Sequence, residues 1–256
     1  MAIDWRIQAV TTTASDLPAA YPGGPSHPAG SVLILVSQVT PRKGPPITFP
    51  APSAAALAMN LAAEAARSAE TVKSNLEFGE APSPDGTVRN LKRDSTGQLF
   101  DYFEKCLVSV VFSVQALEAY SNYKLAYNLK EPLQVERRGT IVTLALDDAE
   151  RELSLDEKIG AVLPDLLGLR SPRGQIVWER YVHLRRLRDA TVHFKSRHQW
   201  STAGATFDES PYAYFVQESP LAIPRAALEV FRYFALPHEL AWVDGANTVL
   251  EGEGKP

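Results

Sequence analysis

The clearest regularity along the chain is a run of apolar positions from Gln98 to about Lys130. These positions recur at steps of three and four residues, which is the spacing of one face of an α-helix. Pro132 follows and predicts the end of this helix. The apolar positions are Leu99, Phe103, Cys106 or Leu107, Val110, Val114 and Leu117.

A second helix is predicted from Ser154 to about Leu167. Ser154 is followed three residues later by Glu157, which is the spacing of a capping box. Pro164 lies inside the pattern, so we expect it to end or kink the helix.

Two further helices are predicted after the turn at residues 171–174. Gln175 to about Lys195 contains no glycine or proline, and Pro224 stands at a first-turn position of a helix that runs to about Phe234. Four helices from Gln98 onward are most simply arranged as a helical bundle.

The first fifty-two residues are interrupted by nine prolines, which predict loops with at most short strands. Val32–Val36 is apolar and β-branched, so it is predicted to be a strand. Ser53 then caps an alanine-rich helix that runs to about Phe78. Gly79–Gly97 is predicted to be a loop or mobile linker, and Thr140–Leu144 a strand in a small insertion.

These elements predict a mainly α protein in three parts. Residues 1–96 form a Pro-rich arm with a short strand and one Ala-rich helix. Residues 97–240 form the helical domain, and residues 241–256 form a flexible tail.

Composition narrows the functional classes. The chain has 256 residues, of which 45% are hydrophobic and 22% charged, so it is not disordered throughout. Its net charge of −4 excludes a generally basic nucleic-acid coat protein. The single cysteine, Cys106, excludes an intrachain disulfide framework and a cysteine zinc cluster.

We expect a soluble, cytoplasmic protein that contacts no membrane. Its start lacks the pattern of a signal peptide, and Leu107–Val114 is far shorter than the ~20 apolar residues of a membrane helix. Phosphate-binding, dinucleotide-binding and metalloprotease motifs are missing, so no cofactor and no metal are predicted.

Positive charge is concentrated between Glu179 and His198. This segment holds six basic residues and two acidic ones, a net charge of +4 in a chain whose total is negative. Such a segment attracts phosphate groups, although a solvated helix face is the alternative interpretation. The basic residues are Arg180, Arg185, Arg186, Arg188, Lys195 and Arg197.

The arrangement Arg188-x-x-x-x-His193, which begins Leu187-Arg188-Asp189 and follows Trp178, resembles the HEPN (higher eukaryotes and prokaryotes nucleotide-binding) superfamily. The order of the predicted helices around it is similar to that of many HEPN bundles. The resemblance extends over Gln98–Phe234 and implies a HEPN-like four-helix bundle.

The resemblance implies a metal-independent endoribonuclease of a toxin or antiviral defence system. Arg188 would hold the RNA phosphate, His193 would transfer protons and Asp189 would orient the imidazole ring. Glu118 and Asn122 would support the site. RNA contacts are assigned to Arg185, Arg186, Lys195, Arg197 and His198. The implied partners are a second copy of the chain, with both motifs at one cleft, and an antitoxin or defence-system protein.

Several alternatives stay open. On an ideal helix Arg188 and His193 point about 140° apart, so they converge only through a long arginine side chain, a helix end near His193 or a partner subunit. Arg188 could instead pair with Glu118, and Asp189 with Arg185. His193 could simply complement the helix dipole. The alternative function is a catalytically silent HEPN module that dimerises or binds nucleotide or protein.

Overall fold

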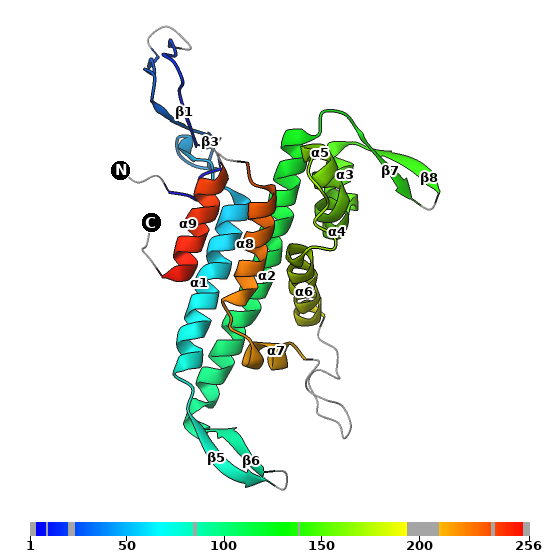
Figure 1. Ribbon diagram of the computed structural model, residues 1–256. Helices are drawn as coiled ribbons and strands as arrows, with labels where there is room; N and C mark the ends of the chain where they lie inside the picture. Colours follow the sequence, from blue (N-terminus) through cyan, green and yellow to red (C-terminus); the bar gives the residue numbers. More distant parts are fainter. Residues whose placement is uncertain are drawn as a thin grey trace.

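Helices dominate the computed structural model, which describes residues 4–8, 10–19, 24–83, 86–137, 139–193, 210–236 and 239–252. Its strands form four separate antiparallel pairs (Figure 1). The mainly helical class and the partly β character of the N-terminal segment are therefore confirmed. None of the described helices is long and apolar enough to cross a membrane.

Two long antiparallel helices, α1 (Ala54–Ser74) and α2 (Thr96–Asn128), lie side by side at the centre of the molecule (Figure 1). Ser53 caps α1 as predicted, because its hydroxyl accepts a hydrogen bond from the Ala56 amide at 3.2 Å. The buried face of α1 is largely alanine, whose short side chains allow close helix packing. The buried alanines include Ala58, Ala62, Ala63, Ala66 and Ala69.

Two C-terminal helices pack against this pair: α8 (Ala222–Phe234), as predicted, and α9 (Leu240–Glu251). The prediction of a flexible tail at residues 241–256 is wrong for the part of it that α9 occupies. This helix begins beside a buried ion pair between Glu239 and Lys124 of α2. Its apolar residues recur at helical spacing and are buried against the core, and this burial stabilises the helix. They are Val243, Ala246, Val249 and Leu250.

The helix α6 (Ile176–Val192) packs against α2 and α8. It ends before the predicted Lys195, which lies outside the described residues. A further helix, α7 (Pro211–Gln217), forms in the stretch between the two predicted helices, for which the sequence analysis predicts no helix. Ser210 caps it, and Pro211 occupies a first-turn position, where a missing N–H costs nothing.

Between α2 and α6 the chain forms a compact helical segment. It consists of α3 (Leu146–Glu152), α4 (Leu155–Glu157), a π-helical turn labelled η2 (Lys158–Val162) and α5 (Leu163–Leu167). The predicted capping box is present at the start of α4. The sequence does not predict α3 as a separate helix.

Pro164 does not end this helical segment. Proline has no N–H to donate to the carbonyl four residues earlier, which belongs to Gly160. The Ser171 hydroxyl donates to the Gly160 carbonyl instead, at 2.6 Å. The π-helical turn before Pro164 and this hydroxyl together accommodate the proline.

The predicted loop at Gly79–Gly97 is instead a hairpin of β5 (Phe78–Ser83) and β6 (Gly86–Leu91), followed by the 3-10 turn η1 (Arg93–Ser95). A two-stranded ladder leaves one edge of each strand free of hydrogen bonds. Pro82 is tolerated in β5 for this reason.

The predicted strand at Val32–Val36 is also corrected. The chain breaks at Leu35 into β2 (Val32–Ile34) and β3 (Val36–Val39), which belong to different pairs. Their partners are β1 (Val10–Thr12) and β4 (Ile47–Pro50).

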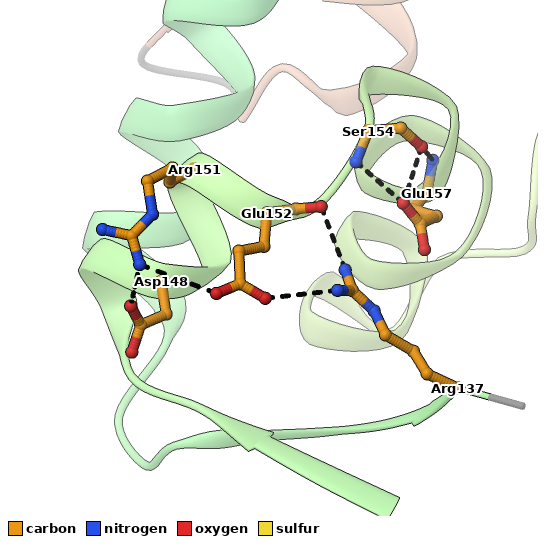
Figure 2. A network of polar contacts seen from close by, with 6 residues as sticks. All are labelled: Arg137, Asp148, Arg151, Glu152, Ser154 and Glu157. Atoms are coloured by element: carbon orange, nitrogen blue, oxygen red, sulfur yellow. Dashed lines mark hydrogen bonds and ion pairs between the residues drawn. The ribbon is translucent and has the colours of Figure 1, made fainter. Parts of the chain in front are cut away.

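The predicted strand at Thr140–Leu144 is confirmed as β8, and it pairs with β7 (Leu133–Arg137). Figure 2 shows how this hairpin is fixed to α3. The Arg137 guanidinium donates to the Glu152 carboxylate at 3.2 Å and to the Glu152 carbonyl at 2.9 Å. The Ser154–Glu157 capping box lies beside this contact (Figure 2).

Candidate functional site

The HEPN-like motif lies at the last turn and the exit of α6. Arg188 and Asp189 belong to the helix, whereas His193 is the first residue beyond it and donates its backbone N–H to the Asp189 carbonyl at 3.0 Å. The His193 backbone, with φ −113° and ψ 60°, leaves the helical path, and its side chain is exposed. One of the three conditions for convergence, a helix end at His193, is therefore met.

A fully buried lysine lies on the helical segment that precedes α6. The Lys158 ammonium donates to the Glu118 carboxylate, to the Asn122 amide oxygen at 2.8 Å and to the Glu150 carbonyl at 2.8 Å. An ammonium has three donors, so all of them are used. Glu118 and Asn122, predicted as supporting residues, are thus brought together by Lys158.

A second polar contact joins α4 to α6. The Asp156 carboxylate accepts a hydrogen bond from the Tyr181 hydroxyl at 2.5 Å and forms an ion pair with Arg185 at 3.0 Å. Burial raises the pKa of the Tyr181 phenol, and its hydrogen bond to Asp156 acts in the same direction. The hydroxyl therefore stays protonated and holds Asp156 in place.

Neither of the two alternative ion pairs, Arg188 with Glu118 and Asp189 with Arg185, is present among the residues that the structure describes. Arg188 forms an ion pair with Asp189 at 3.2 Å, whereas Glu118 is the partner of Lys158. Arg185 pairs with Asp156 rather than with Asp189.

Two guanidinium groups on this flank of α6 keep unused donors. The Nε–H groups of Arg185 and Arg188 are buried, and no described residue accepts a hydrogen bond from them. A buried donor without an acceptor costs about 1–3 kcal/mol. Arg185 and Arg188 are three residues apart, so they lie on one helix face, and each side chain is 33% exposed. Guanidinium groups bind phosphate oxygens well.

The positive charge counted along the sequence is largely compensated in the fold. Three of the four arginines of α6 form ion pairs with carboxylates, and Arg186 is the exposed exception within the described part of the chain. This finding favours a solvated helix face over a broadly basic surface. The pairs are Arg180 with Glu229, Arg185 with Asp156 and Arg188 with Asp189.

Sequence reasoning missed Lys158, Asp156 and Tyr181 as parts of this site. Lys158 carries a detectable signal, because it stands among the apolar positions of its helix, between Leu155 and Val162. A charged side chain on an apolar face needs a buried partner. No comparable pattern marks Asp156 or Tyr181.

Three predicted RNA-binding residues, Lys195, Arg197 and His198, lie outside the described residues. Within the described ranges, no group of three or more His, Cys, Asp or Glu side chains is placed to hold a metal ion.

Comparisons with known proteins found no relative of this chain. No family model matches the chain, and no curated protein or solved structure shows significant similarity to it. The resemblance to the HEPN superfamily therefore depends on the motif and the order of the helices alone.

Proposed function

We propose that the chain is a metal-independent endoribonuclease of HEPN type, possessing a HEPN-like four-helix bundle and working in a toxin or antiviral defence system. The partly exposed Arg188 guanidinium, on a helix that ends at the exposed His193, carries this proposal. The helices α2, α4–α5, α6 and α8 occur along the chain in the order that the proposal expects, with the short helix α7 between α6 and α8.

The chemistry suits these residue types. Cleavage of RNA without metal requires removal of a proton from a 2′-hydroxyl, stabilisation of charge on the phosphorus oxygens and protonation of the leaving oxygen. A histidine exchanges protons near neutral pH, so His193 performs the proton transfer. Arg188 is always charged and binds the phosphate through two donors. Asp189 holds the Arg188 side chain through their ion pair.

The second candidate is a catalytically silent module that dimerises or binds nucleotide or protein. The ion pair between Arg188 and Asp189 favours it, because a guanidinium that already has a carboxylate partner binds phosphate less strongly.

An RNA cleavage assay in EDTA separates the two candidates. We expect His193→Ala and Arg188→Ala each to lower the cleavage rate by about 10²–10⁴-fold, the usual contribution of acid–base catalysis. Because both residues act on one step, the double variant should be little slower than either single variant. Arg232→Ala is the matched control, since Arg232 is an exposed arginine of α8.

Two results would overturn the nuclease proposal. One is a His193→Ala protein that melts like the parent and cleaves RNA equally well. The other is activity that is lost on chelation and returns with magnesium. A parent protein that cleaves no RNA but binds a partner would favour the silent module.

A further inference from the structure

A pocket of about 500 Å³ lies between α6 and α8, and α7 contributes to its wall. Its volume falls in the range of roughly 300–1,000 Å³ that is typical of small-molecule sites. The floor is apolar and consists of side chains that are themselves buried. These are Leu184, Leu187, Ile223 and Ala226.

This pocket is separate from the HEPN-like motif. Each residue of an α-helix turns by about 100°, so His183 lies to one side of the buried Leu184 and Arg185 to the other. The pocket is lined by the His183 side of α6, whereas Arg185 and Arg188 occupy the opposite flank.

The wall of the pocket is aromatic. The rings of His183 and Tyr214 lie with their centroids 4.8 Å apart at an interplanar angle of 46°. Burial raises the pKa of Tyr214 to about 12, and the neighbouring Glu218 acts in the same direction, so the ring carries no charge at neutral pH. An apolar floor beside an aromatic wall suits a flat ring.

The rim of the pocket offers one available cation. Arg180 of α6 and Glu229 of α8 pair with each other across the rim. Arg225, in the first turn of α8, is exposed and has no ion-pair partner among the described residues. Glu179, the other charged residue of the rim, is exposed and lies on the His183 side of α6, so the cation of Arg225 is the feature that favours an anion at the rim.

We propose that this pocket binds a flat aromatic molecule with one negatively charged group. The ring lies on the apolar floor against Tyr214, and the charged group lies at the rim near Arg225 and His183. Aromatic carboxylates and nucleoside monophosphates share this chemistry.

Calorimetric titration of the full chain tests the proposal with chosen probes. The charged aromatic probes are 2-naphthoate and adenosine monophosphate. The controls are 2-naphthol, which has the ring without the charge at neutral pH, and acetate and inorganic phosphate, which have the charge without the ring. We expect one charged aromatic probe to bind at a single site at least about tenfold more tightly than the controls. Preference for 2-naphthoate would indicate an aromatic carboxylate as the ligand, and preference for adenosine monophosphate would indicate a nucleoside monophosphate.

Variants locate the binding. Arg225→Gln should weaken the charged aromatic probe by about tenfold and leave 2-naphthol unchanged, whereas Arg232→Gln on the same helix should change neither. Ala226→Leu should fill the floor and abolish binding. If Ala226→Leu does not fold, Tyr214→Leu replaces it and should weaken all aromatic probes.

The proposal is overturned if no charged aromatic probe saturates at millimolar concentration, or if 2-naphthol binds as tightly as the better of the two charged aromatic probes. It is also overturned if binding is unchanged in Arg225→Gln but lost in Arg188→Ala, since that would place the probe on the motif flank. The RNA cleavage assay is independent of each of these outcomes.

Discussion

The Lys158 side chain is completely buried, whereas the side chain of its partner Glu118 is 41% exposed. The two residues are 40 positions apart in sequence. The pair is therefore asymmetric: water can reach the carboxylate but not the ammonium. Loss of the carboxylate leaves a buried charge, whereas loss of the ammonium leaves a carboxylate that water can solvate.

This asymmetry predicts unequal effects of mutation. Glu118→Ala should lower the free energy of unfolding by about 3 kcal/mol, because Lys158 keeps only neutral acceptors. Lys158→Met should lower it by less than about 2 kcal/mol, because an apolar side chain suits the buried site. Urea unfolding measures both, with Glu104→Ala, an exposed position of α2, as the control. A larger loss for Lys158→Met would contradict the prediction.

The capping box predicts a pH dependence of stability. The hydrogen bond from the Ser154 hydroxyl lowers the pKa of Glu157 below its ordinary value of 4.5, and the Ser154 backbone N–H and Arg137 act in the same direction. A lowered carboxyl pKa stabilises the fold above the unfolded-state pKa, and this contribution is lost as pH falls through the folded-state value.

Glu157→Gln should therefore be less stable than the parent at pH 7 by about 1 kcal/mol, a typical capping contribution. The two proteins should converge towards about pH 3, where the Glu157 carboxyl is protonated. Thermal or urea unfolding across this range checks the prediction. A difference that stays constant or grows as pH falls would show that the charged carboxylate does not stabilise this helix start.

The N-terminal arm is held to α9 by a close contact between Trp5 and Gly245. A Cβ atom at position 245 would lie 2.5 Å from Cγ of Trp5, so any side chain there must displace the ring. Gly245→Ala should lower the free energy of unfolding by about 1–3 kcal/mol through overpacking. This loss should occur although alanine favours helix over glycine by about 1 kcal/mol.

The Trp5→Ala background separates these two effects. There the contact is removed, so Gly245→Ala should stabilise the protein by up to about 1 kcal/mol through helix propensity alone. A double-mutant cycle gives the coupling between the two positions. Stabilisation by Gly245→Ala in both backgrounds would contradict a role for the contact.

The proposed nuclease also predicts a dimer. In a HEPN-type site both motifs of a dimer face one cleft, so a second Arg188–His193 motif supplied by a two-fold partner through α6 would complete the site. Light scattering without RNA should show a dimer at micromolar concentration. Val192→Asp, at an apolar side chain that is 51% exposed on α6, should shift the protein towards monomer. Val216→Asp on α7, 54% exposed, is the matched control. A monomeric parent would count against the shared site.

Features that depend on neighbouring residues were predictable from the sequence. The apolar spacing places α2 to within two residues at each end, and Ser53 and the Ser154–Glu157 pair mark two helix starts. These signals are local, because helix periodicity and capping involve residues at most four positions apart. The motif on α6 was visible for the same reason.

Tertiary structure alone decided which charged groups from distant parts of the sequence form ion pairs, and where a pocket lies. The sequence shows four arginines on α6, but only packing brings Asp156 and Glu229 to two of them. Lys158 meets Glu118 because α2 and the helical segment before α6 lie together. Such contacts join residues far apart in sequence, so no local pattern encodes them. The pocket between α6 and α8 follows from the same packing, since neither helix forms a cavity by itself.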